Sequence, residues 1–174
     1  FTVRKDGELE GKAKALYPYV KGKKVICAKR LPHNPLTKLY MYYKHIPSRV
    51  IVTDDYNRYL RHFQLRQSQR VVQLWHAGAG FKSSGYSRWG HYGCPKPQSC
   101  HRQYKYGIAG SKNIAPFFSE VWGLNDEQVL PTGMPRMDEY LDETHKQQKI
   151  EELHKKYPAT VGKKVILFAP TYRG

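Results

Sequence analysis

The sequence lacks any hydrophobic run near the length of about 18 residues that crosses a bilayer, and it opens without a signal-peptide pattern. Cysteine is scarce: Cys27, Cys94 and Cys100 are the three present, which argues against a disulfide scaffold and suits a reducing compartment. Glycine and proline number 14 and 11 among 174 residues, which excludes collagen-like and low-complexity chains. The length fits one globular domain and little more. Because the chain begins at Phe1 without a start Met, we expect it to be a piece of something longer.

Acidic residues are missing from a long middle stretch. Thirty Lys and Arg face fourteen Asp and Glu, for a formal net charge of +16. From Tyr56 to Ser119 there is no acid, while the bases there are Arg58, Arg61, Arg66, Arg70, Lys82, Arg88, Lys96, Arg102, Lys105 and Lys112. A region of one sign implies a polyanionic partner, because its self-repulsion otherwise destabilises the fold. Nucleic acid, an anionic membrane surface or a phosphate-bearing substrate fits this requirement, and a merely basic surface is the plain alternative.

Short β-branched runs alternate with helix-like stretches, which predicts an α/β domain with a largely parallel sheet. Strands are expected at 24–28, 49–53, 70–75, 106–110, 128–130 and 164–169. Helical patterns occupy 35–46, 56–67, 114–122 and 141–156, and Ser111 is a candidate N-cap for the third. No helix follows the last predicted strand, so we expect a second lobe to begin near Lys163.

The segment from Val71 to Lys82 favours chemistry most strongly, since a buried strand runs directly into His76 and a glycine-bearing loop. Ligands of open α/β sheets bind beyond the carboxyl ends of strands. Gly78 and Gly80 let backbone N–H groups approach phosphate oxygens, Lys82 adds a cation, and His76 can move protons near neutral pH. The spacing matches neither a Walker loop nor a dinucleotide fingerprint. The alternative is a hydrogen-bonded core histidine beside glycines that only turn the chain.

Three further strand ends repeat the pairing of a small or hydroxyl residue with a cation. Ser111 precedes a helix whose N-terminus could hold an anion, or only water. Arg136 could lie beside a phosphate or pair with Asp138, and Thr171 and Arg173 follow the last predicted strand. Four such ends along one rim of a sheet favour a phosphate site more than any one does alone.

Metal and base-stacking sites are weaker candidates. His91, Cys94, Cys100 and His101 lack a usual zinc spacing, so we expect neither a metal nor a cofactor. The basic, Tyr-rich stretch 56–62 could stack bases or contact an anionic membrane, but aromatic residues at helical spacing more often pack in a core.

Four motifs stand in order along the chain. They read Gln-Leu-Trp-His-Ala-Gly-Ala-Gly-Phe-Lys at 73–82, Tyr-Gly-Ile-Ala-Gly-Ser at 106–111, Val-Leu-Pro-Thr-Gly-Met-Pro-Arg-Met-Asp at 129–138, and Ile-Leu-Phe-Ala-Pro-Thr-Tyr-Arg at 166–173. With them, residues 49–174 resemble the CDP-glycerol glycerophosphotransferase family, which builds wall and lipoteichoic acids in Gram-positive bacteria. The first motif has Trp-His-Ala-Gly where the family pattern has Trp-His-Gly-Thr.

The resemblance implies a two-lobed GT-B glycosyltransferase fold. Residues 1–140 would form the Rossmann-like, acceptor-side lobe, 141–162 an interlobe helix and linker, and 163–174 the first strand of the donor lobe. The family's second important histidine and its Asp-Tyr-Ser-Ser segment belong to that later lobe. The 174 residues are therefore expected to be inactive alone.

The implied reaction transfers glycerol phosphate, or ribitol phosphate, from CDP-glycerol or CDP-ribitol to a hydroxyl of an anionic lipid-linked or polymeric acceptor. The family's proposed catalytic histidine maps to His76, a near-neutral base for the hydroxyl that attacks the β-phosphorus and expels CMP. The residues expected to bind the phosphate and stabilise its negative charge are Gly78, Gly80, Lys82, Ser111, Arg136, Thr171 and Arg173. A peripheral place at the cytoplasmic face of the plasma membrane is also implied.

Two other functions compete with this one. A basic α/β module for nucleic acid would fit the charge, but the sequence has no RNP, helix-turn-helix or zinc-finger signature, so no nucleic acid is expected. A GT-B enzyme that uses a nucleotide-sugar donor is the other.

Overall fold

The computed structural model describes residues 1–3, 9, 11–25, 27–28, 34–62, 64–78 and 83–170, without the side chains of Val3, Cys27 and Ala28. These residues belong to two units, Phe1–Met137 and Asp138–Gly174. The first contains the sheet and the core, and the second is mostly helical.

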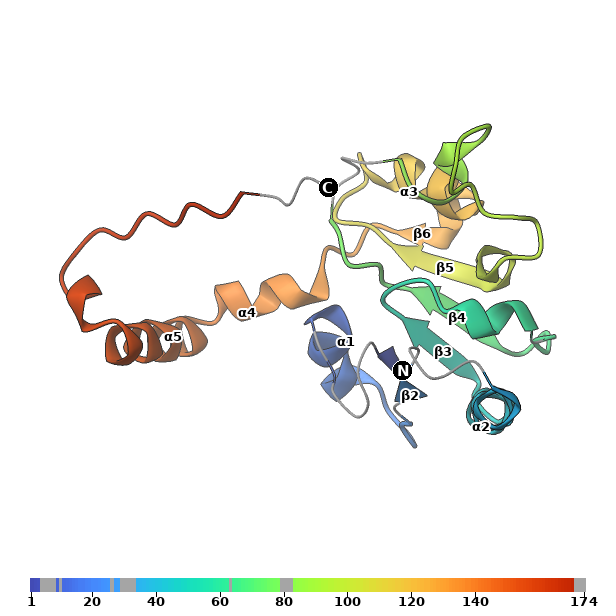
Figure 1. Ribbon diagram of the computed structural model, residues 1–174, viewed down its shortest axis with the longest axis horizontal. Coiled ribbons are helices and arrows are strands. Elements are labelled where there is room, and N and C mark those ends of the chain that lie inside the picture. Colours follow the sequence, from blue (N-terminus) through green and yellow to red (C-terminus); the bar gives the residue numbers. More distant parts are fainter. Residues whose placement is uncertain are drawn as a thin grey trace. The chain divides into compact units, whose positions relative to one another are not determined.

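Six parallel strands form one sheet in the order β2-β1-β3-β4-β5-β6. The strands are β1 (Thr2–Val3), β2 (Cys27–Ala28), β3 (Val50–Thr53), β4 (Arg70–Gln73), β5 (Tyr104–Ile108) and β6 (Val129–Leu130). Figure 1 shows β3 to β6 side by side. The predicted parallel α/β sheet is confirmed, and parallel pairing brings every carboxyl end to one edge, where such sheets bind ligands.

The helices of the first unit are α1 (Gly11–Leu16), α2 (Pro35–His45) and α3 (Ala115–Trp122). Helix α2 begins where the sequence predicts, because Asn34 accepts a hydrogen bond from Thr37 N at 2.8 Å and Pro35 suits the first turn. Its last residue, His45, lies just before Pro47, which disfavours further helix. The described 3₁₀ helices are η1 (Tyr17–Tyr19), η2 (Arg58–His62), η3 (Gly85–Arg88), η4 (Cys100–Gln103), η5 (Asp126–Gln128), η6 (Pro135–Met137) and η7 (Pro158–Thr160).

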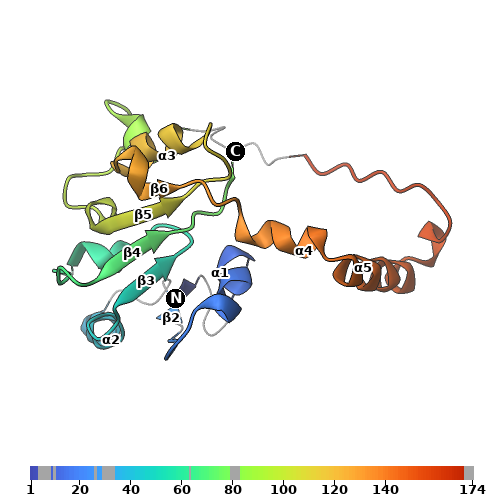
Figure 2. The ribbon, with the colours of Figure 1, turned by 180° about the vertical axis from the view of Figure 1, so that it is seen from behind.

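Alternate strand residues face two different hydrophobic clusters. Ile51 and Val71 point to the face covered by α2 and α3, while Val52 and Leu74 point to the face covered by α1. Both views show α1 near the carboxyl ends of β3 and β4 (Figures 1 and 2). The helices therefore cover both faces of the sheet, as its mostly apolar strands require.

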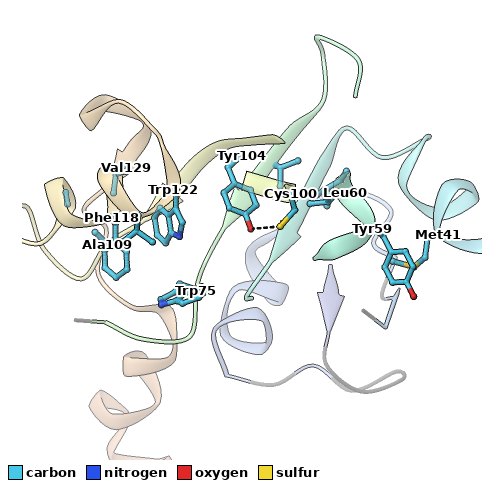
Figure 3. Packing of buried hydrophobic residues seen from close by; sticks show 14 residues of the cluster. Met41, Tyr59, Leu60, Trp75, Cys100, Tyr104, Ala109, Phe118, Trp122 and Val129 are labelled. Carbon is cyan, nitrogen blue, oxygen red and sulfur yellow. Dashed lines mark hydrogen bonds between the residues drawn. The ribbon is translucent and has the colours of Figure 1, made fainter. Parts of the chain in front are cut away.

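The larger cluster contains the buried aromatic side chains of Tyr59, Trp75, Tyr104, Phe118 and Trp122 (Figure 3). Phe118 and Trp122 of α3 stack with ring centroids 4.7 Å apart, and both are almost fully buried. The Cys100 thiol and the Tyr104 hydroxyl lie 3.5 Å apart within the same cluster. Burial raises the pKa of both groups, so they stay neutral near pH 7.

The second unit contains α4 (Asp138–Leu141) and α5 (Glu143–Lys156). Helix α5 confirms the predicted solvated helix, since none of its residues is buried, and its N-cap Asp142 accepts from Thr144 N and His145 N. The predicted strand 164–169 is wrong: these residues form no strand, and Phe168 is 85% exposed. A strand needs a neighbour for its ladder, and the described part of this unit has none.

Two local predictions in the first unit also need correction. The described residues of the stretch 56–67 contain only the 3₁₀ helix η2, not a longer helix. Helix α3 starts at Ala115, with Ile114 rather than Ser111 as its N-cap. A start at Ser111 would put Pro116 inside the helix, where its ring clashes with the preceding turn. None of the described helices is long and apolar enough to cross a membrane.

Candidate active site at the carboxyl edge of the sheet

The end of β4 makes an unusual turn. Trp75 has φ +55°, a left-handed conformation that a bulky residue adopts at a cost of about 1–3 kcal/mol. The surrounding structure supports it: Trp75 N donates to the buried Gln73 Oε1 at 2.9 Å, and the indole packs 4.9 Å from the Tyr56 ring. The turn therefore buries Trp75 and sends the next side chain outward.

His76 lies on the surface at this turn, with its imidazole 4.2 Å from the Trp75 ring. The alternative of a core histidine is wrong for His76. Among the described residues of the first unit, the buried histidines are His45 and His101 instead. An exposed imidazole at the carboxyl end of a strand can meet a substrate and exchange a proton with it.

A buried lysine supports the same turn from the other face of the sheet. Lys12 of α1 is 3% exposed, and its Nζ donates to Leu74 O at 2.8 Å and lies 3.5 Å from Ala77 O. Burial and, after it, the charge of Arg136 lower the pKa of Lys12 from 10.5 to about 8, while Asp54 raises it. The sequence analysis missed Lys12, because one basic residue among thirty carries no local signal of its burial.

Glycines allow the ends of β4, β5 and β6 to meet. A Cβ on Gly78 would collide with the Met134 side chain, and one on Gly110 would lie 3.2 Å from Gly78 O. Gly133 N donates to Ala109 O at 3.1 Å, which ties the segment after β6 to the end of β5. Three of the four strand ends singled out in the sequence therefore share one rim.

The predicted site residues are placed unevenly. His76, Ser111 and Arg136 are exposed on the first unit, and Gly78 is half-buried in the contact just described. Arg136 belongs to η6, which packs against α1 and so stands on the same side as Lys12. The remaining candidates lie outside the described residues: Gly80, Lys82, Thr171 and Arg173.

Two of the four Cys and His residues considered as metal ligands belong to the core. Cys100 and His101 are buried, while Cys94 is half-buried and His91 is exposed. Three aromatic rings surround His101, those of Tyr56 at 4.9 Å and of Tyr86 and Tyr104 at 5.3 Å. Throughout the described ranges, no three His, Cys, Asp or Glu side chains converge as metal ligands would.

Solved structures of the wall teichoic acid polymerase TagF share this fold. One matches 94% of this chain and 44% of its own with a TM-score of 0.61 at 20% identity, a likeness that defines the fold class. A family model described as CDP-Glycerol:Poly(glycerophosphate) glycerophosphotransferase matches residues 4–174, and the chain belongs to that family. The resemblance seen in the motifs is confirmed and extends nearly to the first residue.

Curated relatives share more of the sequence. The chain is 43% identical over 135 residues to the teichoic acid poly(ribitol-phosphate) polymerase of Bacillus spizizenii, covering 77% of this chain and 22% of that protein. It is 42% identical over 125 residues to the teichoic acid ribitol-phosphate polymerase TarK of Staphylococcus aureus, covering 71% and 24%. A teichoic acid glycerol-phosphate primase of Bacillus subtilis is 30% identical over 148 residues, covering 80% and 36%. The chain thus spans about a quarter of the length of the two ribitol-phosphate polymerases.

Proposed function

We propose that the protein containing this chain transfers ribitol phosphate from a CDP-activated donor to a hydroxyl of a growing teichoic acid. The family assignment supports a CDP-polyol donor, and a histidine variant of the related TagF was solved after soaking with CDPG. The identities of 42% and 43% to ribitol-phosphate polymerases, against 30% to a glycerol-phosphate primase, favour ribitol over glycerol. Glycerol phosphate is the second candidate group.

The observation that carries this proposal is the exposed His76 imidazole at the carboxyl end of β4, inside the family's Trp-His motif. In the proposed step, His76 accepts the proton of the acceptor hydroxyl while the hydroxyl oxygen bonds to the β-phosphorus. The bond from that phosphorus to the bridging oxygen breaks, and CMP leaves with the electron pair. General base catalysis of this kind contributes about 10²- to 10⁴-fold to a rate.

Charge on the phosphate oxygens needs fixed positive groups nearby. Arg136 is on the described rim, and Ser111 and the backbone at Gly78 lie at neighbouring strand ends. Gly80, Lys82, Thr171 and Arg173 stay predictions from the sequence for the same role. We expect no metal or cofactor, because the Cys and His residues between positions 91 and 101 lack a usual zinc spacing.

The division of labour between lobes is part of the proposal. Residues 1–140 would hold the acceptor, 141–162 would link the lobes, and the donor lobe would start at 163, so the 174 residues would not react alone. The net charge of +16 suits an anionic acceptor and an anionic membrane surface, consistent with a peripheral place at the cytoplasmic face of the plasma membrane.

The test is His76→Ala in the full-length protein, with transfer measured from CDP-ribitol, CDP-glycerol and a UDP-sugar. We expect CDP-ribitol to be the best donor and the variant to lose about 10²-fold or more of its rate. His91→Ala is the matched control, because His91 is also exposed but stands away from the motif. Unchanged turnover in the His76 variant would refute the assignment. Preference for the UDP-sugar, or tight and steeply salt-dependent binding of DNA or RNA, would instead support one of the two competing functions.

A further inference from the structure

Lys12 reaches the turn that presents His76 from an element distant in sequence. Its Nζ lies 2.8 Å from Leu74 O and 3.5 Å from Ala77 O, so the two carbonyls on either side of Trp75 and His76 face one ammonium. A fully charged lysine is seldom buried without such partners, because water no longer solvates it. The position of Lys12 is therefore a built feature and not a chance contact.

The turn has a reason to need this support. Trp75 sits at φ +55°, and conformations of this kind persist only where surrounding contacts over-determine them. Gln73 and the packing of the indole hold the strand side of the turn. Lys12 donates from α1 to two carbonyls of the turn, and such charge-assisted hydrogen bonds are stronger than those between neutral groups.

We propose that Lys12 is a positioning residue for the reaction, whose ammonium fixes the turn from Leu74 to Ala77 and thereby the place of the His76 imidazole. The inference rests on the proposed role of His76 as the base. It assigns Lys12 no contact with substrate. Misplacement of a reacting group by about 1 Å can cost about 10²-fold in rate, so a loosened turn should act on kcat.

The charged groups around Lys12 give this role a pH signature. Asp54, after β3, favours the ammonium, Arg136 of η6 opposes it, and His76 stands in the turn itself. Burial first and then the charge of Arg136 lower the pKa of Lys12 to about 8, against the opposing effect of Asp54. Loss of the proton between pH 7 and 9 removes the charge assistance from its hydrogen bonds. The alkaline limb of kcat should therefore have an apparent pKa near 8.

The experiment compares Lys12→Met, Lys12→Arg and Lys14→Met in the full-length enzyme, with CDP-ribitol as donor. Lys14 is the matched control, because it is on the same helix but exposed. We expect Lys12→Met to lower kcat by about 10- to 100-fold with the KM for the donor within about twofold of wild type. Lys12→Arg should restore part of kcat and abolish the limb near pH 8, since arginine keeps its charge. Wild-type kcat in Lys12→Met, or a limb near pH 8 that persists in Lys12→Arg, would overturn the proposal.

Hydrogen exchange separates this inference from the proposed function. In Lys12→Met, the peptide that covers residues 72–78 should exchange faster while peptides of β3 and β5 keep their rates. Full activity of His76→Ala together with that faster exchange in Lys12→Met would refute the catalytic role of His76. It would still support the stabilisation of the turn by Lys12. If Lys12→Met does not fold, the wild-type enzyme decides: exchange of 72–78, corrected for intrinsic rates, should rise about fivefold or more from pH 7 to pH 9. No rise would overturn the proposal.

Discussion

Acidification should lower the stability of the first unit, because this unit buries two neutral histidines. His45 and His101 are 3% and 5% exposed, and burial lowers the pKa of each from 6.5 to about 4. His45 has Nδ1 2.7 Å from Met41 O and accepts at Nε2 from Asn57, so protonation of Nε2 would break the second contact. Within the described part of the chain, His101 Nε2 and Trp122 Nε1 are buried without a hydrogen-bond partner.

The sign and size of the effect follow from the two pKa values. The pKa of each histidine is lower in the folded protein than in the unfolded chain. The free energy of unfolding is therefore highest above pH 6.5, and each histidine lowers it as the pH falls from 6.5 through 4. Between these values the unfolded chain binds more protons than the folded one. At pH 5 the loss is about 2 kcal/mol per histidine, or about 30-fold in the opening equilibrium.

Hydrogen exchange of the β4 and α3 peptides in the full-length protein measures this loss at pH 7 and pH 5. On acidification, exchange protection should fall about 30-fold less in His101→Phe than in wild type, because phenylalanine suits the ring-lined site and cannot titrate. The exposed His91→Gln should behave as wild type. If His101→Phe loses as much protection as wild type on acidification, the buried-histidine explanation is wrong.

Two further substitutions test the packing beneath the site, each read by exchange of β4 and β5 peptides. Gly107→Ala should destabilise by about 1–3 kcal/mol, since the new Cβ collides with the buried Trp122 ring. Trp122→Leu in the same chain should recover part of that cost, and independent, additive effects would contradict the collision. Gln73→Met should lower the free energy of unfolding by about 1–3 kcal/mol, because it leaves the buried Trp75 N–H unpaired. Asp55 O also loses its bond from Gln73 but keeps the one from Thr53 Oγ1 at 2.7 Å. Unchanged protection of β4 would count against this bond.

Local sequence was sufficient where the physics is local. Asn34 and Pro35 set the start of α2, and β-branched runs located β3 and β4, because capping and strand propensity act within a few residues. It was insufficient where the outcome depends on partners. The predicted strand 164–169 has strand-like composition but no neighbour in the described part of its unit, and 56–67 has helical spacing but forms the short η2.

The candidate site divides in the same way. The sequence alone determined the family, the place of His76 after a parallel strand and the glycines that let strand ends approach, because motif order and residue type are written along the chain. Only the tertiary structure decided that Trp75 turns left-handed, that Gly78 meets Met134 and that Lys12 is buried beneath the turn. Lys12 and Leu74 are 62 residues apart, and no local propensity specifies a hydrogen bond over that separation. That hydrogen bond forms because α1 packs on the sheet and buries Lys12 beside the end of β4.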